Sequence, residues 1–135
     1  MIGALSSRSQ SVCLLDDDTS VLKAMSRLLS SEGWEVEAFS DPIHFLHYAQ
    51  AHQPPLLVLD ILMPQLSGLE VQAQLRILSP NTHVVVLTSN DDPGVRSQAM
   101  NGGALGFFVK PVDDCEFLAG LRSAAALNGD GRVEG

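Results

Sequence analysis

Short apolar runs alternate along the chain with longer segments in which apolar residues recur every three or four positions. The short runs are typical of β-strands, and the longer periodic segments are typical of amphipathic helices. Five strands are predicted, at Val12–Leu15, Glu35–Phe39, Leu56–Asp60, Val84–Leu87 and Gly106–Val109. Five helices are predicted, at Thr19–Glu32, after Ser40-Asp41-Pro42, and at Ser67–Leu78, Pro93–Asn101 and Asp113–Leu127.

The pattern within the strands predicts how the sheet is covered. Leu56–Leu59 and Val84–Leu87 are apolar throughout, whereas Glu35–Phe39 alternates and should be half exposed or at an edge. Repeated strand–helix units with apolar strands form parallel sheets with helices on both faces. Right-handed crossovers then favour an α/β fold: a flavodoxin-like, doubly wound, five-stranded parallel sheet of order 2-1-3-4-5 with five helices. The helix Pro93–Asn101 has a weak apolar pattern and should be the least firmly packed.

Composition and charge limit the kinds of function that this protein can have. The chain has 135 residues, enough for one domain with a substantial core. Its formal net charge of −8 argues against binding by this chain to nucleic acid or to an anionic membrane surface. Met1–Ser11 contains no long apolar stretch, so we expect no signal peptide or membrane span and a cytoplasmic location. Cys13 and Cys115 match no metal-ligand spacing, and Cys13 should be a buried reduced thiol.

Polar residues stand where the predicted strands end. Asp16, Asp17 and Asp18 follow the first strand, Asp60 closes the third, Thr88 follows the fourth and Lys110 follows the fifth. Each alone would more often be a helix cap, a solvated loop or a surface residue. The carboxyl ends of parallel strands meet at one edge of the sheet, where open α/β sheets bind their ligands. The residues together therefore indicate one shared site.

The chemistry of these residue types is consistent with phosphoryl transfer. Two carboxylates from the group Asp16–Asp18, together with Asp60, offer the hard oxygen ligands that Mg²⁺ prefers. The metal and Lys110 would neutralise the carboxylates and stabilise a phosphoryl group in transit. Asp60 is the candidate nucleophile that forms an aspartyl phosphate, and Thr88 can donate its hydroxyl to a phosphoryl oxygen.

Several motifs then resemble one known family. Leu14–Asp18, Leu59–Pro64 with Ser67-Gly68, Leu87–Ser89 and Phe108–Pro111 look like the receiver domain of two-component response regulators, in the same order. This interpretation divides the chain into a flexible leader (residues 1–11), a receiver domain (residues 12–127) and a linker or tail (residues 128–135). The resemblance implies that Asp60 accepts a phosphoryl group from a sensor histidine kinase or a phosphotransfer protein. The protein would be a signalling switch, with no catalysis beyond its own phosphorylation and dephosphorylation.

The resemblance also implies a role for each site residue. It implies Mg²⁺ binding by Asp16, Asp17, Asp60 and the backbone carbonyl of Leu62, phosphate binding by Lys110, and a conformational switch formed by Thr88 and Phe107. Asp18 is then left to cap the following helix. Without the resemblance, Phe107 would be interpreted as an ordinary core or surface aromatic residue. The apolar side chain of Leu62 cannot position a hydrolytic water, so we expect slow self-dephosphorylation.

Partners and output follow from the same resemblance. We expect a homodimer or partner contact through Pro93–Asn101, Gly106–Val109 and the final helix, with Phe117–Leu121 at its margin. The chain could be a stand-alone receiver, part of a DNA-binding regulator or part of a hybrid kinase. Three segments, Ser6–Ser11, Ser67–Gln72 and Gly102–Val112, look most like receivers that precede a LuxR-type helix-turn-helix, which predicts transcription regulation.

Two other functions compete with this interpretation. A haloacid-dehalogenase-like phosphatase would use Asp16 as its nucleophile, and Asp16-Asp17-Asp18 nearly supplies the signature Asp-x-Asp-x-Thr/Val. Ser20 stands where Thr or Val belongs, however, and Asp60 is left without a role. A small ligand-binding flavodoxin-like module would need a glycine-rich or Ser/Thr-rich phosphate loop after the first strand, and the sequence has none there.

Overall fold

Strands and helices alternate along the chain in a computed structural model that describes residues 10–134, with side chains described for residues 10–127. The elements are β1 (Ser11–Leu15), α2 (Thr19–Ser31), β2 (Glu35–Phe39), α3 (Pro42–His52), β3 (Leu56–Leu59), α4 (Gly68–Leu78), β4 (His83–Thr88), α5 (Pro93–Asn101), β5 (Gly106–Val109) and α6 (Asp114–Glu134). All neighbouring strands are parallel, and their order is β2-β1-β3-β4-β5. The predicted fold class and strand order are confirmed, and a helix follows each strand as predicted.

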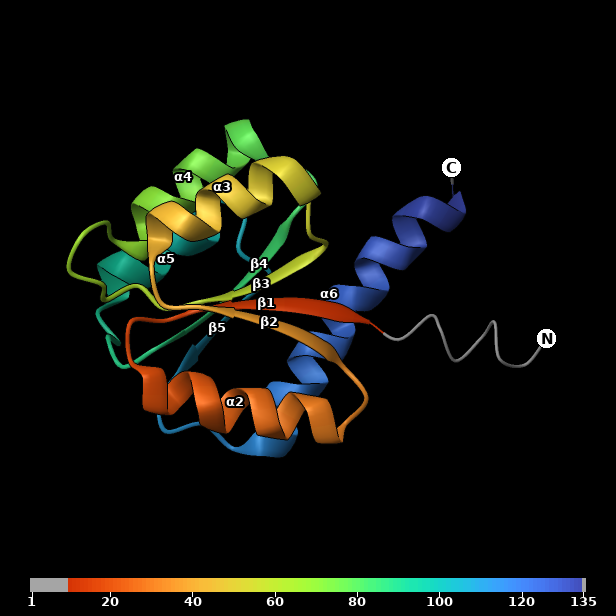
Figure 1. The fold of residues 1–135 in the computed structure, drawn as a ribbon, viewed down its shortest axis with the longest axis horizontal. Helices are drawn as coiled ribbons and strands as arrows, with labels where there is room; N and C mark the ends of the chain where they lie inside the picture. The colour runs from red at the N-terminus through yellow and green to blue at the C-terminus, as the bar shows by residue number, and fades with distance from the viewer. Residues whose placement is uncertain (1–9, 135) are drawn as a thin grey trace.

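Helices cover both faces of the sheet (Figure 1). The helices α3, α4 and α5 lie on one face, and α2 and α6 lie on the other. Successive side chains of a strand point to opposite faces, so each strand contributes to two cores. Cys13, Leu57 and Val86 pack toward α3, α4 and α5, whereas their neighbours pack toward α2 and α6. The uniformly apolar strands therefore follow from burial on both faces.

Polar side chains begin each of the described helices, including α6, where Asp113 Oδ2 accepts a hydrogen bond from the Glu116 N–H at 3.0 Å. Asp18, Asp41, Ser67 and Asp92 each accept hydrogen bonds from backbone N–H groups in the first turn of the helix that follows. These caps satisfy donors that have no partner within the helix. Ser67 and Glu70 form a reciprocal capping box at the start of α4. The prediction that Asp18 caps a helix is confirmed.

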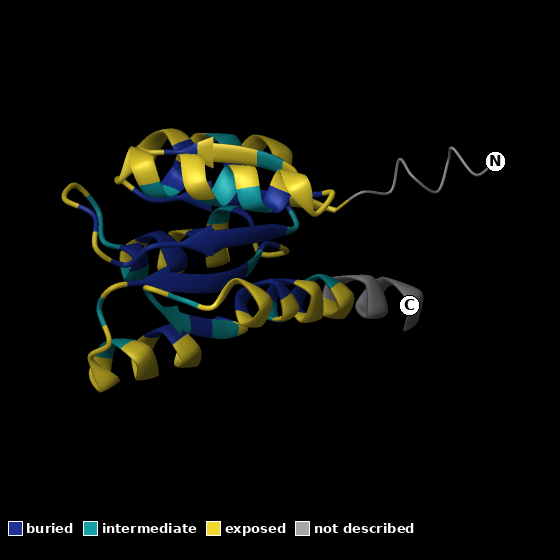
Figure 2. Cartoon of the chain, turned by 90° about the horizontal axis from the view of Figure 1, so that it is seen from below, coloured by how far each residue is buried: buried dark blue, intermediate teal, exposed yellow. Residues whose placement is uncertain are grey.

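Burial differs sharply between the sheet and its edge (Figure 2). All residues of β3 are buried, whereas Glu35 and Glu37 are exposed on β2, which pairs only with β1. The predicted edge strand is confirmed. The helix α5 has only Ala99 buried, which agrees with its predicted loose packing.

The structure corrects two predictions about the final helix. Phe117 and Leu121 are fully buried and Leu118 is 7% exposed, so they cannot form the margin of a partner surface. Helical periodicity directs these side chains into the core beneath β4 and β5. The helix also continues to Glu134 instead of ending at Leu127. Once a helix is formed, each added residue gains a hydrogen bond, so the two glycines near its end do not stop it.

The structure describes little of the predicted leader. Residues 1–9 of the predicted leader lie outside the described residues. Ser11 is already part of β1, opposite Glu35 of β2. No helix within residues 10–134 is long and apolar enough to cross a membrane.

Candidate functional site

Asp60 is the first residue after β3 and is 5% exposed. Its backbone N–H donates to the carbonyl of Leu15 at 3.0 Å, which fixes it beside the end of β1. The start of α4 packs directly on the same backbone. A Cβ on Gly68 would lie 2.4 Å from the Asp60 carbonyl oxygen and 2.7 Å from the Ile61 Cα. Asp60 therefore needs glycine at position 68 in order to keep its place.

Asp16 occupies the corresponding position after β1 and is also 5% exposed. Its Oδ2 accepts a hydrogen bond from Lys110 Nζ at 2.8 Å, and its Oδ1 accepts one from the Asp18 N–H at 2.9 Å. Lys110 Nζ lies 3.9 Å from Asp60 Oδ2. The backbone N–H of Lys110 donates to the Thr88 carbonyl at 2.8 Å. One ammonium group therefore lies between two buried carboxylates.

Three carboxylates converge at this edge of the sheet. Asp16, Asp17 and Asp60 each offer an oxygen, and these oxygens lie within 4.8 Å of one another. Asp17 is exposed, so the group opens to solvent on one side. An oxygen-only donor set with one open side fits Mg²⁺, which binds few carboxylates and keeps several waters. Asp18 is absent from the group because its side chain caps α2.

Burial sets the electrostatics of Asp60. The low-dielectric surroundings raise the pKa of its carboxyl group, and the neighbouring charge of Asp16 raises it further. The Thr88 hydroxyl, Lys110 and the Leu62 amide oppose this rise, in that order. The Leu62 N–H lies 3.3 Å from Asp60 Oδ1. A cation that approached Asp60 would offset the repulsion between the carboxylates of Asp60 and Asp16.

Thr88 and Phe107 lie on adjacent strands behind the carboxylates. Thr88 is fully buried, and its Oγ1 accepts a hydrogen bond from the Asn90 N–H at 3.2 Å. Phe107 is opposite Val86 of β4 and is 7% exposed. The guanidinium carbon of Arg96, on α5, lies 5.3 Å from the centre of the Phe107 ring. Every predicted site residue thus lies at or next to the carboxyl edge of the sheet.

Comparison with known proteins agrees with this geometry. Residues 12–122 match the family described as the response regulator receiver domain. The chain belongs to this family. It is 37% identical to the response regulator protein TodT of Pseudomonas putida over 123 residues, which are 91% of this chain and 54% of TodT. It is 36% identical to the response regulator MprA of Mycobacterium avium over 112 residues, or 83% of this chain and 49% of MprA.

The chain spans about half the length of these relatives. Among solved structures, the response regulator StyR is 35% identical, with a TM-score of 0.84 over 93% of this chain and 64% of that one. A CheY-like receiver domain protein of Methanospirillum hungatei has a TM-score of 0.86 at 23% identity, over 91% of this chain and 98% of its own. The second likeness concerns the fold alone.

The structure shows what Leu62 and Gly68 contribute to the site of this receiver domain. Leu62 is 49% exposed, and its apolar side chain offers Asp60 no polar group at that position. Gly68 appeared in the sequence only as part of a motif. Its role depends on the contact between α4 and the backbone after β3, and residue spacing alone does not reveal that contact.

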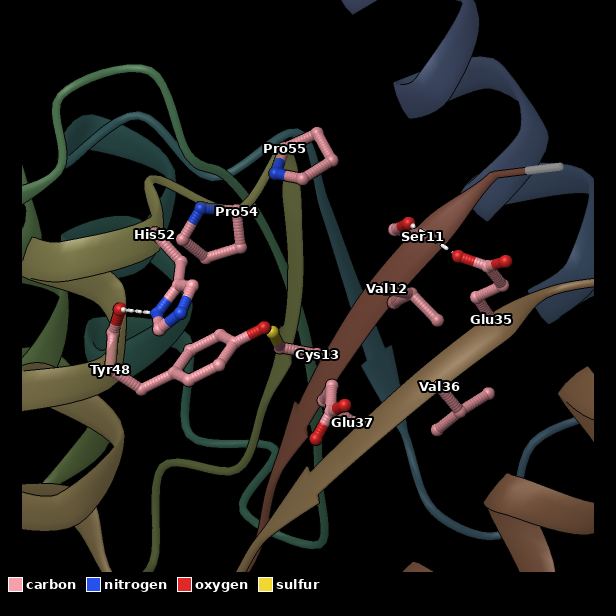
Figure 3. A pocket seen from close by; sticks show the side chains of 10 residues that line it. All are labelled: Ser11, Val12, Cys13, Glu35, Val36, Glu37, Tyr48, His52, Pro54 and Pro55. Atoms are coloured by element: carbon pink, nitrogen blue, oxygen red, sulfur yellow. Dashed lines mark hydrogen bonds between the residues drawn. The ribbon is translucent and has the colours of Figure 1, made fainter. Parts of the chain in front are cut away.

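Two cavities lie near opposite ends of the receiver's strands. A cavity of about 150 Å³ next to the carboxylates is lined by Asp17, Ser40, Asp41, Pro42, Pro64 and Gln65. A second, of about 330 Å³, lies at the amino ends of β1 and β2, where Tyr48 and Cys13 face each other (Figure 3). The second cavity is therefore separate from Asp60.

Proposed function

We propose that this receiver domain is a phosphoacceptor switch in which Asp60 takes a phosphoryl group from a sensor histidine kinase or a phosphotransfer protein. The convergence of Asp16, Asp17 and Asp60 within 4.8 Å, with Lys110 beside them, carries the proposal. Asp16 and Asp60 are buried, and buried negative charge is unfavourable unless cations neutralise it. A site that recruits cations around a carboxylate is suited to receiving an anionic group.

The transfer itself requires little from the protein beyond position and charge. An oxygen of Asp60 attacks the phosphorus of the phosphohistidine. The new P–O bond forms as the P–N bond breaks, and the histidine nitrogen leaves with the electron pair. When bound, Mg²⁺ supplies positive charge next to the transferred group, held by Asp16, Asp17, Asp60 and the Leu62 carbonyl. Lys110 balances the remaining charge.

Thr88 then links the phosphoryl group to the rest of the domain. Its hydroxyl can donate to a phosphoryl oxygen on Asp60 while Oγ1 still accepts from the Asn90 N–H, so a shift of Thr88 toward the phosphoryl group would draw Asn90 with it. Asn90 leads directly into α5, and Arg96 of α5 contacts Phe107. The movement would therefore reach the surface formed by α5, β5 and α6. Met100 and Leu105 are 40% and 37% exposed there, which supports a homodimer or partner contact.

The output of the switch is part of the same proposal. TodT and MprA are response regulators in which the shared region makes up about half of the chain. We propose transcription control through a LuxR-type output, with the cytoplasm as location. The free thiols of Cys13 and Cys115 are consistent with a reducing compartment.

Intact-mass measurement tests the acceptor. The protein is incubated with acetyl phosphate and Mg²⁺, with a chelator as a parallel control. We expect the mass gain of one phosphoryl group in the parent and in Asp91→Asn, which alters an exposed aspartate. We expect no gain in Asp60→Asn. A gain that persists in Asp60→Asn would exclude Asp60 as the acceptor.

The same experiment separates the phosphatase alternative. That reading needs Asp16 as a free nucleophile, whereas both of its oxygens accept hydrogen bonds, one of them from Lys110. Rapid turnover of acetyl phosphate that Asp16→Asn abolishes and Asp60→Asn preserves would favour the phosphatase. We expect no such rapid turnover, and we expect Asp60→Asn to abolish phosphorylation of the protein.

A further inference from the structure

The helix α5 is most deeply buried at its C-terminal end. Ala99, in its last turn, is its only buried residue and is fully buried. The Ala99 carbonyl accepts a hydrogen bond from the side-chain amide of Gln72, whose Nε2 lies 2.8 Å away. It also accepts one from the Ala104 N–H at 3.1 Å. The deepest burial and the tethering hydrogen bond thus coincide at Ala99, whereas Val95 is only partly buried against the core and Arg96 lies over the Phe107 ring.

Gln72 is itself an unusual residue for its place. It lies on α4 among Val71 and Leu75, and it is only 5% exposed. Burying a side-chain amide is unfavourable unless it is hydrogen-bonded. Displacing the end of α5 would remove the acceptor of this buried amide. Gln72 therefore opposes movement of α5 at its C-terminal end.

Gly102 confines the Gln72 side chain from the other side. A Cβ at position 102 would lie 3.0 Å from both Cδ and Oε1 of Gln72. The backbone of Gly102 has a φ of −78°, which alanine also adopts, so glycine is needed here for space and not for conformation. The amide is held between α4 and the end of α5.

The opposite end of α5 is attached differently. Its cap, Asp92, is exposed, and the Asp92 N–H donates to Asn90 Oδ1 at 3.0 Å. The Asn90 N–H in turn donates to Thr88 Oγ1 at 3.2 Å. The N-terminal end is thus connected to the hydroxyl that the proposed switch moves, through polar contacts near the surface.

We infer that Gln72 is a positioning residue for the switch, fixing the C-terminal end of α5 so that a signal from Thr88 moves mainly the N-terminal end. The inference rests on the proposed function for the origin of the signal. The anchor itself does not depend on phosphorylation. The inference predicts that the two ends of α5 respond differently to phosphorylation of Asp60.

Hydrogen exchange of the α5 amides tests the anchor in the unphosphorylated protein. Gln72→Met keeps the length of the side chain and removes its donor, and Ala99 keeps its bond from Ala104. We expect exchange in the last turn of α5 to rise about tenfold, the effect of losing one hydrogen bond. Gln74→Met, at an exposed position of the same helix, is the matched control. Unchanged exchange in Gln72→Met, or an equal rise in α3 and α6, would overturn the anchor.

A second variant guards against a change of fold. Gly102→Ala should displace the Gln72 amide and raise exchange in the same turn. Because both substitutions remove the same bond, their double variant should show less than the product of the two single effects. Full multiplication of the two effects would contradict a shared mechanism.

Acetyl phosphate and Mg²⁺ then test the movement. We expect phosphorylation of the parent to change exchange in the first turn of α5 and leave the last turn protected. In Gln72→Met, both ends should change. A parent that is phosphorylated on Asp60 but changes equally at both ends would overturn the inference. A parent that is not phosphorylated at all would overturn the proposed function and the movement with it, and the anchor would still be decided by the unphosphorylated comparison.

Discussion

Lys110 lies closer to Asp16 than to Asp60: its Nζ is 2.8 Å from Asp16 Oδ2 and 3.9 Å from Asp60 Oδ2. The lysine thus neutralises the carboxylate that is not the proposed acceptor. Asp60 keeps a larger share of uncompensated charge, and its nearest side-chain cation is in reach without being bonded. A phosphoryl group on Asp60 could attract Lys110 without a rearrangement of the sheet.

Replacing Lys110 should slow phosphorylation strongly. Lys110→Ala removes the cation that faces the transferred group, and loss of one such stabilising group typically lowers a rate by about 10²–10³. The initial rate of phosphoprotein formation from acetyl phosphate, followed by intact mass, measures this effect. Lys23→Ala, at an exposed position of α2, should match the parent. Equal rates in the parent and Lys110→Ala would show that Lys110 has no part in the transfer.

Replacing Gly68 should destabilise the fold and disturb the site together. The added Cβ of Gly68→Ala would meet backbone atoms of Asp60 and Ile61 that cannot easily move. We expect a loss of about 1–3 kcal/mol in the free energy of unfolding, as for an overpacked core. Urea denaturation measures it. In Gly94→Ala the added Cβ would meet only an Asp92 carboxylate oxygen, at 3.1 Å, so this control should differ little from the parent.

Leu62 should lengthen the life of the phosphoryl group. Its apolar, exposed side chain cannot orient a water toward Asp60. In Leu62→Asn a side-chain amide becomes available, and we expect the half-life of phosphorylated protein to fall by roughly tenfold, below the range for a fully positioned catalyst. Mass measured over time after removal of the phosphodonor provides the half-life. A half-life that stays the same or lengthens would count against this role.

Cys13 should make stability depend on alkaline pH. Burial raises the pKa of its thiol from 9.0 to about 12, and Glu37 adds to the rise. Between these values the unfolded chain releases the proton and the folded chain keeps it. The contribution of Cys13 to the free energy of unfolding is therefore fully present below pH 9 and declines as the pH rises toward 12.

Urea denaturation at several pH values above 9 measures this decline. The decline should be shallower in Cys13→Ala than in the parent. Cys115→Ala, at an exposed position, should keep the slope of the parent. Burial raises the pKa of Tyr48 and the neighbouring Cys13 raises it further, so the difference in slope between the parent and Cys13→Ala includes the effect of Cys13 on Tyr48. Identical slopes in the parent and Cys13→Ala would contradict the linkage.

Local patterns were sufficient to predict most of the fold. The apolar run Leu56–Leu59 and the cap at Asp18 depend on neighbouring residues, so the sequence reveals them directly. The site could be predicted because parallel strands bring their carboxyl ends to one edge. The pairing of Lys110 with Asp16 depends on distances between β1 and β5, which sequence spacing does not determine.

Other features required the packed structure. Gln72 looks like an ordinary polar residue of a helix surface, and only the approach of α5 explains why it is buried. The prediction that Phe117–Leu121 form a surface margin was wrong because the sequence does not show which face of the final helix meets the sheet. The packing against β4 and β5 resolves this in favour of the core.

The edge strand β2 has a consequence for assembly. Within residues 10–134 no strand pairs with its outer side, and such an edge readily pairs with a strand of another chain. Glu35 and Glu37 are exposed along it, so two copies that met edge to edge would bring four carboxylates together. This repulsion disfavours sheet extension between copies through β2.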